Sequence, residues 1–97
     1  MPDKINLLIV DDDVRLSTVL SRVLTTTGRF SVTVVNDPLE ACAEAVRLQP
    51  DLIILDVIMP VKDGGTVASE IHQEPTLKTV PVIFLTAVIN HQEAAAR

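Results

Sequence analysis

Side chains that carry oxygen ligands follow three apolar segments of the chain. Asp11 and Asp12 follow residues 5–10, Asp56 follows residues 52–55, and Thr86 follows residues 80–85. Two unit charges about 4 Å apart repel by roughly 4 kcal/mol at the dielectric of a protein surface. If folding brings the three carboxylates together, one must take up a proton or the cluster must bind a cation. Because an all-oxygen set suits a hard divalent ion, the sequence predicts a Mg²⁺ site.

Asp56 is the residue at the centre of this chemistry. The apolar run before it does not alternate with polar residues, which predicts a strand covered on both faces. Ligands of open parallel sheets bind outside the carboxyl ends of the strands, so Asp56 is placed at a site. A metal ion beside it would neutralise charge on an incoming phosphoryl group. We therefore predict that Asp56 accepts a phosphoryl group and that the Thr86 hydroxyl donates a hydrogen bond to it.

Taken singly, these residues also have ordinary structural explanations. An acid pair after a strand is often a helix cap with solvent-facing charge, and Thr is common in strands. The prediction depends on their joint occurrence, in this order, at the ends of successive strands.

The elements that would position these residues alternate along the chain. Strands are predicted at residues 5–10, 30–35, 52–55 and 80–85, the last with Pro81 at its start. Helical segments separate them, which favours an α/β fold with a parallel sheet, helices on both faces and right-handed crossovers.

Apolar residues at helical spacing predict which face of each helix is buried. They form three sets: Leu16, Leu20, Val23 and Leu24 in the first helix; Leu39, Cys42, Ala43 and Val46 in the second; Val67, Ala68 and Ile71 in the third. Asp13 is expected to cap the first helix and Gly28 to end it. Asn36-Asp37-Pro38 is expected to start the second, and a fourth begins at Asn90.

Composition excludes several classes of protein. The 97 residues suffice for one domain, and the net charge of -5 with two Phe and no Trp or Tyr disfavours direct nucleic-acid binding. No apolar run is long enough to span a membrane and no signal-peptide pattern is present, so we expect a cytoplasmic location. Cys42 is the only cysteine, which rules out an internal disulfide and favours a buried apolar role.

Three motifs resemble the receiver domain of two-component response regulators. They are residues 10–12 (Val-Asp-Asp), 56–64 (Asp-Val-Ile-Met-Pro-Val-Lys-Asp-Gly) and 81–87 (Pro-Val-Ile-Phe-Leu-Thr-Ala). The resemblance extends over residues 1–97, as a single receiver domain. It implies a flavodoxin-like doubly wound parallel sheet with strand order 2-1-3-4.

The resemblance also implies a role for each site residue. Asp56 matches the phosphoacceptor, which a sensor histidine kinase or a phosphotransfer protein would phosphorylate. Asp12 matches a direct Mg²⁺ ligand, Asp11 its partner acting through water, and the backbone carbonyl of Ile58 a further ligand. Thr86 matches the switch hydroxyl. We expect a signalling domain that catalyses only its own phosphotransfer and dephosphorylation, rather than an enzyme.

The sequence departs from the family pattern at its end. A full receiver continues into a fifth strand with a site lysine and an aromatic switch residue, and a fifth helix; this sequence ends within the fourth helix. Lys62 and Lys78 precede Thr86, so neither can be assigned the role of the missing site lysine. Three explanations stay open: the remainder lies beyond this sequence, the chain was cut, or another chain covers the exposed fourth strand. The third would give a dimer or a swapped assembly.

Two other functions compete with the phosphoacceptor. A phosphorylation-independent interaction or dimerisation module would keep the fold without the chemistry. An aspartyl-phosphate hydrolase is disfavoured because such enzymes usually place a second Asp two residues after the first, where this chain has Ile58.

A homodimer and a C-terminal output domain beyond this sequence are further partners that we allow for. Gly64 and Gly65 fit the turn that starts the third helix beside the site.

Overall fold

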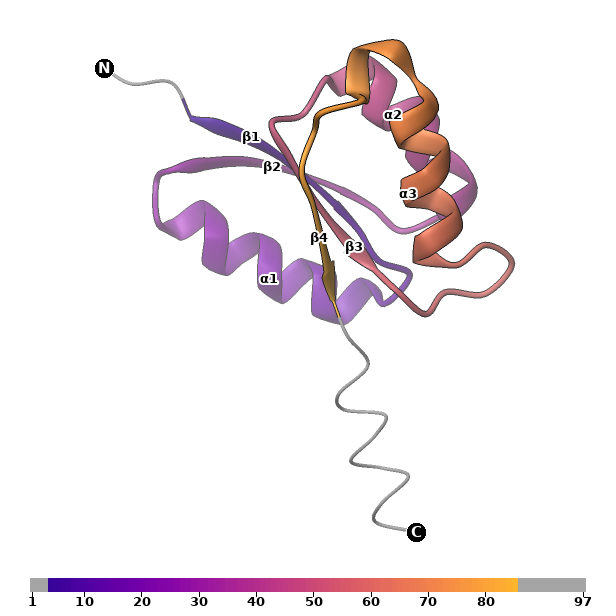
Figure 1. Ribbon diagram of the computed structural model, residues 1–97. Helices are drawn as coiled ribbons and strands as arrows, with labels where there is room; N and C mark the ends of the chain where they lie inside the picture. The colour runs from indigo at the N-terminus through magenta and orange to yellow at the C-terminus, as the bar shows by residue number, and fades with distance from the viewer. Residues whose placement is uncertain (1–3, 86–97) are drawn as a thin grey trace, which may run out of the picture.

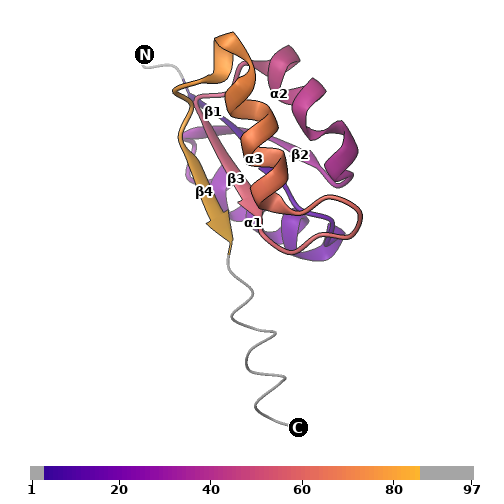
Figure 2. The ribbon, with the colours of Figure 1, turned by 45° about the vertical axis from the view of Figure 1, so that its right-hand side comes forward.

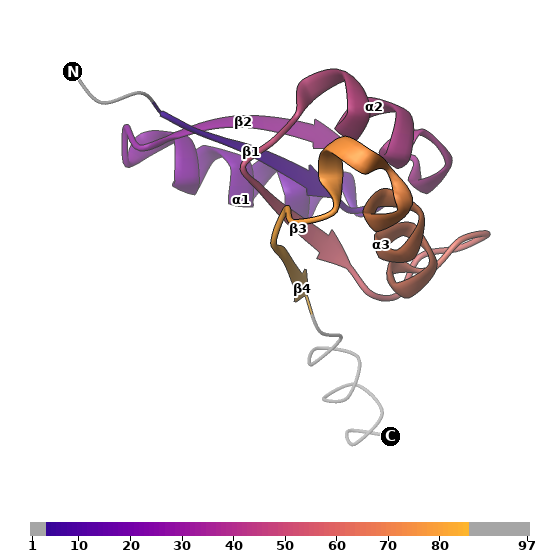
Figure 3. The same cartoon turned by 45° about the horizontal axis from the view of Figure 1, so that its top comes forward.

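A four-stranded parallel sheet forms the centre of the molecule. The computed structural model describes residues 4–85, so Thr86 and the helix expected from Asn90 lie outside the described residues. The strands are β1 (Ile5–Val10), β2 (Phe30–Val35), β3 (Leu52–Asp56) and β4 (Val82–Leu85). Figure 1 shows the strands between the helices, and their spatial order, β2-β1-β3-β4, can be followed in Figure 3. The predicted fold class and strand order are confirmed.

Helices cover both faces of this sheet. Helix α1 (Val14–Thr26) lies on one face, and α2 (Ala41–Leu48) and α3 (Gly64–Gln73) lie side by side on the other (Figures 1 and 2). Two single 3₁₀ turns, η1 (Pro38–Glu40) and η2 (Pro75–Leu77), precede α2 and β4. No helix in the described part of the chain combines the length and the apolar character needed to cross a membrane.

The register of the strands brings the ends of β1 and β3 level with each other. Val10 pairs with Val35 on one side and with Leu55 on the other. Asp56 pairs with Leu85 of β4. The residues that follow β1 and those that end β3 therefore meet at one edge of the sheet.

A core between the sheet and the pair α2 and α3 holds these strand ends in place. Its sheet side includes Leu8, Val10, Ile53 and Leu55, all fully buried. Val67 and Ile71 of α3 are buried against them, as the spacing of α3 predicts. Burying each such side chain contributes about 1.5–3 kcal/mol. Large fixed side chains directly before Asp11 and Asp56 leave the two acids little freedom to separate.

The buried face of α1 differs from the prediction. Leu16 and Val23 are 44% and 58% exposed, whereas Ser17 is fully buried. The hydroxyl of Ser17 donates to the Val14 carbonyl at 3.1 Å and accepts a hydrogen bond from Asn36 at 3.0 Å. A polar side chain can be buried when its hydrogen bonds are satisfied, and periodicity of apolar residues cannot detect this. The predicted cap at Asp13 and the stop at Gly28, whose φ is 76°, are present.

The predicted stripe of α2 is wrong except at Cys42, which is partly buried against the core. Leu39 and Val46 are 57% and 40% exposed, and the buried residues are Ala41 and Ala45. The segment starts with the 3₁₀ turn η1, and the α-helix begins only at Ala41. A 3₁₀ turn has three residues per turn instead of 3.6, so it shifts which residues of the following α-helix face the core. The small side chains of Ala41 and Ala45 let α2 pack closely against its neighbours.

Candidate functional site

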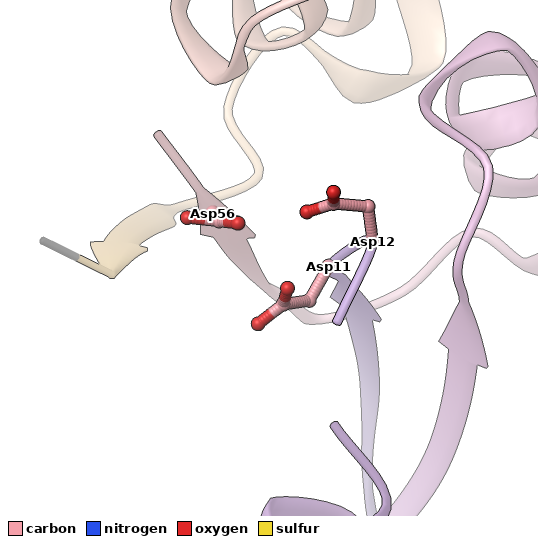
Figure 4. A group of neighbouring side chains, drawn as sticks. All are labelled: Asp11, Asp12 and Asp56. Carbon is pink, nitrogen blue, oxygen red and sulfur yellow. The ribbon is translucent and has the colours of Figure 1, made fainter. Parts of the chain in front are cut away.

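Three carboxylates meet where β1 and β3 end. Asp11 and Asp12 follow β1, and Asp56 is the last residue of β3. One oxygen from each of the three lies within 4.8 Å of the others. Figure 4 shows the side chains gathered around the ends of the two strands. The structure thus brings together Asp11, Asp12 and Asp56, which the sequence placed at strand ends.

Backbone contacts fix the turn that carries Asp11 and Asp12 from β1 into α1. The Asp11 N–H donates to the Val35 carbonyl at 3.1 Å. The Asp13 N–H donates to Asp11 Oδ1 at 2.8 Å, and Asp13 itself caps α1 by accepting from the Leu16 N–H at 3.0 Å. The short connection between β1 and α1 therefore has little freedom to move Asp11 away from Asp56.

Asp11 has an orphaned oxygen atom in this cluster. The residue is only 1% exposed, and its Oδ2 atom has no hydrogen-bond partner among the described residues. An unsatisfied buried acceptor costs about 1–3 kcal/mol, more when it is charged. A divalent cation is the partner that this atom and its all-oxygen surroundings would accept. The residues present therefore fit a Mg²⁺ ion.

The pKa values of Asp11 and Asp56 reflect their burial and the short distances between the carboxylates. Burial raises the pKa of Asp11 above its ordinary value. Burial, followed by the charge of Asp11, raises the pKa of Asp56 to about 6, although the Ile58 N–H partly offsets this rise. Negative charge is therefore disfavoured at Asp11 and Asp56 when no cation is bound.

The loop between β3 and α3 wraps around Asp56. The Ile58 N–H donates to Asp56 Oδ1 at 3.3 Å, which puts Ile58 beside the cluster. Met59 is buried in the core, with 6% of its surface exposed. The Gly64 N–H donates to the Val57 carbonyl at 2.9 Å and closes the loop. The carbonyl of Ile58 as a metal ligand stays a prediction.

Glycine is required at only one of the two positions that start α3. A Cβ on Gly64 would overlap the backbone carbonyl of Asp56, whereas a Cβ on Gly65 would meet Asp63 Oδ1 at an ordinary 3.6 Å. The expected turn therefore depends on Gly64. Asp63 caps α3 by accepting from the Thr66 N–H at 2.8 Å, and this hydrogen bond lowers the pKa of Asp63.

The middle of the same loop contains a tight turn centred on Val61. The Lys62 N–H donates to the Pro60 carbonyl at 2.7 Å, and Val61 has a φ of 72°. This combination is the rare, strained form of the γ-turn. Lys62 Nζ contacts both carboxylate oxygens of Glu70 on α3, at 2.9 and 3.0 Å. Lys62 therefore ties the loop to α3 and is not a cation of the site, as expected from the sequence.

Asn36 contacts the site, a role that sequence reasoning missed. The residue was expected to start the second helix, but Asp37 caps η1 by accepting from the Leu39 N–H at 2.9 Å. Asn36 Nδ2 instead donates to the Asp11 carbonyl at 2.7 Å. An Asn directly after the strand next to β1 was the only signal in the sequence.

Thr86 lies outside the described residues, although the residue before it belongs to the site's surroundings. Leu85 pairs with Asp56, and its carbonyl accepts from the Val57 N–H at 3.3 Å. The role of Thr86 stays a prediction.

Comparisons with known proteins agree on one family. The family model described as the response regulator receiver domain matches residues 7–97. The chain is 39% identical over 82 residues to the DNA-binding dual master transcriptional regulator RpaA of Synechocystis sp.. That match covers 84% of this chain and 34% of RpaA, so the chain spans about a third of this curated relative.

Two solved structures have the same fold. One is the receiver domain of a sensor histidine kinase from Pseudomonas aeruginosa with a magnesium ion coordinated in its active-site cleft. It is 34% identical with a TM-score of 0.81, and the match covers 88% of this chain and 69% of that one. The other is the phosphorylated cyanobacterial phytochrome response regulator RcpA, 32% identical with a TM-score of 0.78; the match covers 95% of this chain and 71% of that one. The chain therefore belongs to the response regulator receiver domain family, which provides the phosphoacceptor domains of two-component signalling systems.

Proposed function

We propose that Asp56 is the phosphoacceptor of this receiver domain and that a sensor histidine kinase or a phosphotransfer protein is the donor. A carboxylate oxygen of Asp56 attacks the phosphorus atom of a phosphohistidine. The new P–O bond forms as the P–N bond breaks, and the imidazole leaves with the electron pair of that bond and takes up a proton. The product is an aspartyl phosphate on this chain.

The observation that carries this proposal is the cluster of Asp11, Asp12 and Asp56. Their oxygens lie within 4.8 Å of one another, and Asp11 Oδ2 is buried without a partner. Carboxylates without a functional role are more stable when they are separated, because each is then better hydrated and the repulsion between them is smaller.

Asp11, Asp12, Asp56 and the carbonyl of Ile58 are the groups that would hold Mg²⁺. When bound, the ion would neutralise the negative charge of the cluster and of the phosphoryl oxygens. The ionisation of Asp56 suits a nucleophile, because a pKa of about 6 leaves its carboxylate mostly ionised at pH 7. The backbone around Asp56 orients it, through the Ile58 N–H and through pairing with Leu85.

Thr86 completes the proposed mechanism as the switch hydroxyl. It would donate a hydrogen bond to a phosphoryl oxygen on Asp56, and its loss of freedom would report phosphorylation to an output domain or to a second copy of the chain.

The phosphorylation-independent interaction module is not favoured, because the chain is homologous to phosphoacceptor domains and retains the three acids.

Incubation with Mg²⁺ and acetyl phosphate, followed by intact-mass spectrometry, tests the proposal. We expect a mass gain of one phosphoryl group that disappears with EDTA and in Asp56→Asn. Asp51→Asn is the matched control, because Asp51 precedes the same strand and its Oδ2 accepts from the Asn6 N–H at 2.8 Å at the opposite edge. Phosphorylation that persists in Asp56→Asn, or none in the wild type, would refute it.

A further inference from the structure

Asn36 links the end of β1 to the first turns of α1. Its Nδ2 atom donates to the Asp11 carbonyl at 2.7 Å and to Ser17 Oγ at 3.0 Å. An amide nitrogen has two N–H groups, so both are used. One side chain at the end of β2 therefore contacts both the end of β1 and the start of α1, which lie close together near the beginning of the chain.

Ser17 is the fixed anchor of this link. It is fully buried, and its hydroxyl donates to the Val14 carbonyl at 3.1 Å while accepting from Asn36. The Ser17 N–H is held by the Asp13 carbonyl at 3.0 Å. Because this buried hydroxyl both donates and accepts a hydrogen bond, its two partners restrict its position and with it the position of the Asn36 amide.

The carbonyl that Asn36 holds belongs to the peptide joining Asp11 to Asp12. The orientation of this peptide plane sets the directions in which both carboxylates project. Repulsion between Asp11 and Asp56 favours any rotation that separates their charges. The hydrogen bond from Asn36 opposes such a rotation, because breaking it would take from the Asp11 carbonyl the partner that lies at 2.7 Å.

We propose that Asn36, supported by Ser17, is a positioning residue that preorganises Asp11 and Asp12 for a divalent cation. The inference rests on the proposed Mg²⁺ site. Groups that orient metal ligands typically change metal affinity by 10- to 100-fold when removed. We expect Asn36→Ala to weaken Mg²⁺ binding by about 10-fold. Because Asn36 is exposed, its truncation leaves no buried cavity.

Gln49 supplies a matched control at the opposite edge of the sheet. Its Nε2 atom donates to the Val46 carbonyl and to Thr76 Oγ1, both at 2.9 Å. Gln49→Ala therefore removes an amide with the same two kinds of partner, a backbone carbonyl and a hydroxyl, but far from the acids.

The experiment is titration of wild type, Asn36→Ala and Gln49→Ala with Mg²⁺ alone by calorimetry, with thermal unfolding in EDTA measured in parallel. Loss of Mg²⁺ affinity in Asn36→Ala, with wild-type affinity in Gln49→Ala, supports the inference. Equal Mg²⁺ affinity in all three proteins overturns the positioning role of Asn36 but does not contradict the proposed Mg²⁺ site. A wild type that does not bind Mg²⁺ refutes the proposed site and the inference with it.

Ser17→Ala keeps the test decisive if Asn36→Ala does not fold. It removes one anchor of the amide but leaves the bond to the Asp11 carbonyl, so we expect a smaller loss, about 3-fold, in Mg²⁺ affinity. Unchanged affinity in a folded Ser17→Ala would count against the positioning role.

Discussion

Asp11 and Asp56 lie at the ends of adjacent strands, and the charge of Asp11 adds to burial in raising the pKa of Asp56 to about 6. Folding therefore places two acids where ionisation of one disfavours ionisation of the other. The repulsion between the two acids is confined to the strand ends, because the residues before each acid are fully buried in the core and hold the strands in place. It makes the metal-free domain sensitive to pH and receptive to a cation.

Without metal ions, stability is predicted to rise as pH falls from 7 to about 4.5. The folded state holds a proton on Asp56 up to about pH 6, whereas the unfolded chain releases it above its ordinary pKa of 3.8. Between these values the folded state binds more protons, so acidification stabilises it. The full difference corresponds to about 3 kcal/mol. Because water reaches the carboxylate, we expect about 1 kcal/mol.

Urea unfolding in EDTA at several pH values, compared between wild type and Asp56→Asn, measures this effect. The difference between the two proteins isolates Asp56 from groups of opposite sign such as Asp63, whose pKa is lowered. Asp56→Asn should be the more stable protein at pH 7 and lose its advantage near pH 4. Parallel pH curves would show that Asp56 is not crowded.

Mg²⁺ affinity is predicted to fall with acidification over the same range. Protons and the cation compete for the Asp56 carboxylate, so the apparent affinity should drop by up to about 10-fold per pH unit below pH 6. The measurement is the Mg²⁺-induced rise in Tm at pH 7.5 and at pH 5, with K⁺ at matched ionic strength as control. An equal rise at both pH values would contradict the prediction.

The acidic site was predictable because its signals are local. Unbroken apolar runs before Asp11 and Asp56 fix the strands, and the ends of parallel strands meet at one edge whatever the details of packing. The order of the strands followed from resemblance to a family, since periodicity alone does not say which strands are neighbours.

The residues that escaped prediction are those whose role depends on a partner far away in the chain. Ser17 is not among the apolar residues predicted to form the buried face of the first helix, yet it is buried because Asn36 satisfies its hydroxyl. The stripe of α2 was misplaced because Pro38 starts a 3₁₀ turn that precedes the α-helix and changes its phase. Neither a hydrogen bond between distant elements nor a change of helix type leaves a periodic signal.

Gly64 and Gly65 are predicted to respond oppositely to the same substitution. Gly64→Ala would force its new methyl group against the backbone of Asp56 and Val57. Such overpacking typically costs about 1–3 kcal/mol. Gly65→Ala meets no obstacle and gains helix propensity, about 0.5 kcal/mol.

Chemical unfolding of the two variants, together with Mg²⁺ titration, distinguishes these outcomes. Gly64→Ala should also impair Mg²⁺ binding, because the displaced backbone carries Asp56. If the two variants have equal stability, the close approach of α3 to β3 is not as tight as the structure indicates.

Val61→Gly is predicted to stabilise the domain. Val61 adopts a φ of 72° in a γ-turn, a conformation that costs a β-branched residue about 1–3 kcal/mol. Its side chain is 88% exposed, so removing it loses almost no burial. Glycine adopts this conformation freely but raises the entropy of the unfolded chain, which returns part of the gain. We expect a net increase of about 1 kcal/mol in the free energy of unfolding. Val61→Ala is the control, because it keeps a Cβ and therefore much of the strain. If glycine and alanine give the same change, burial or solvation rather than backbone strain governs this position.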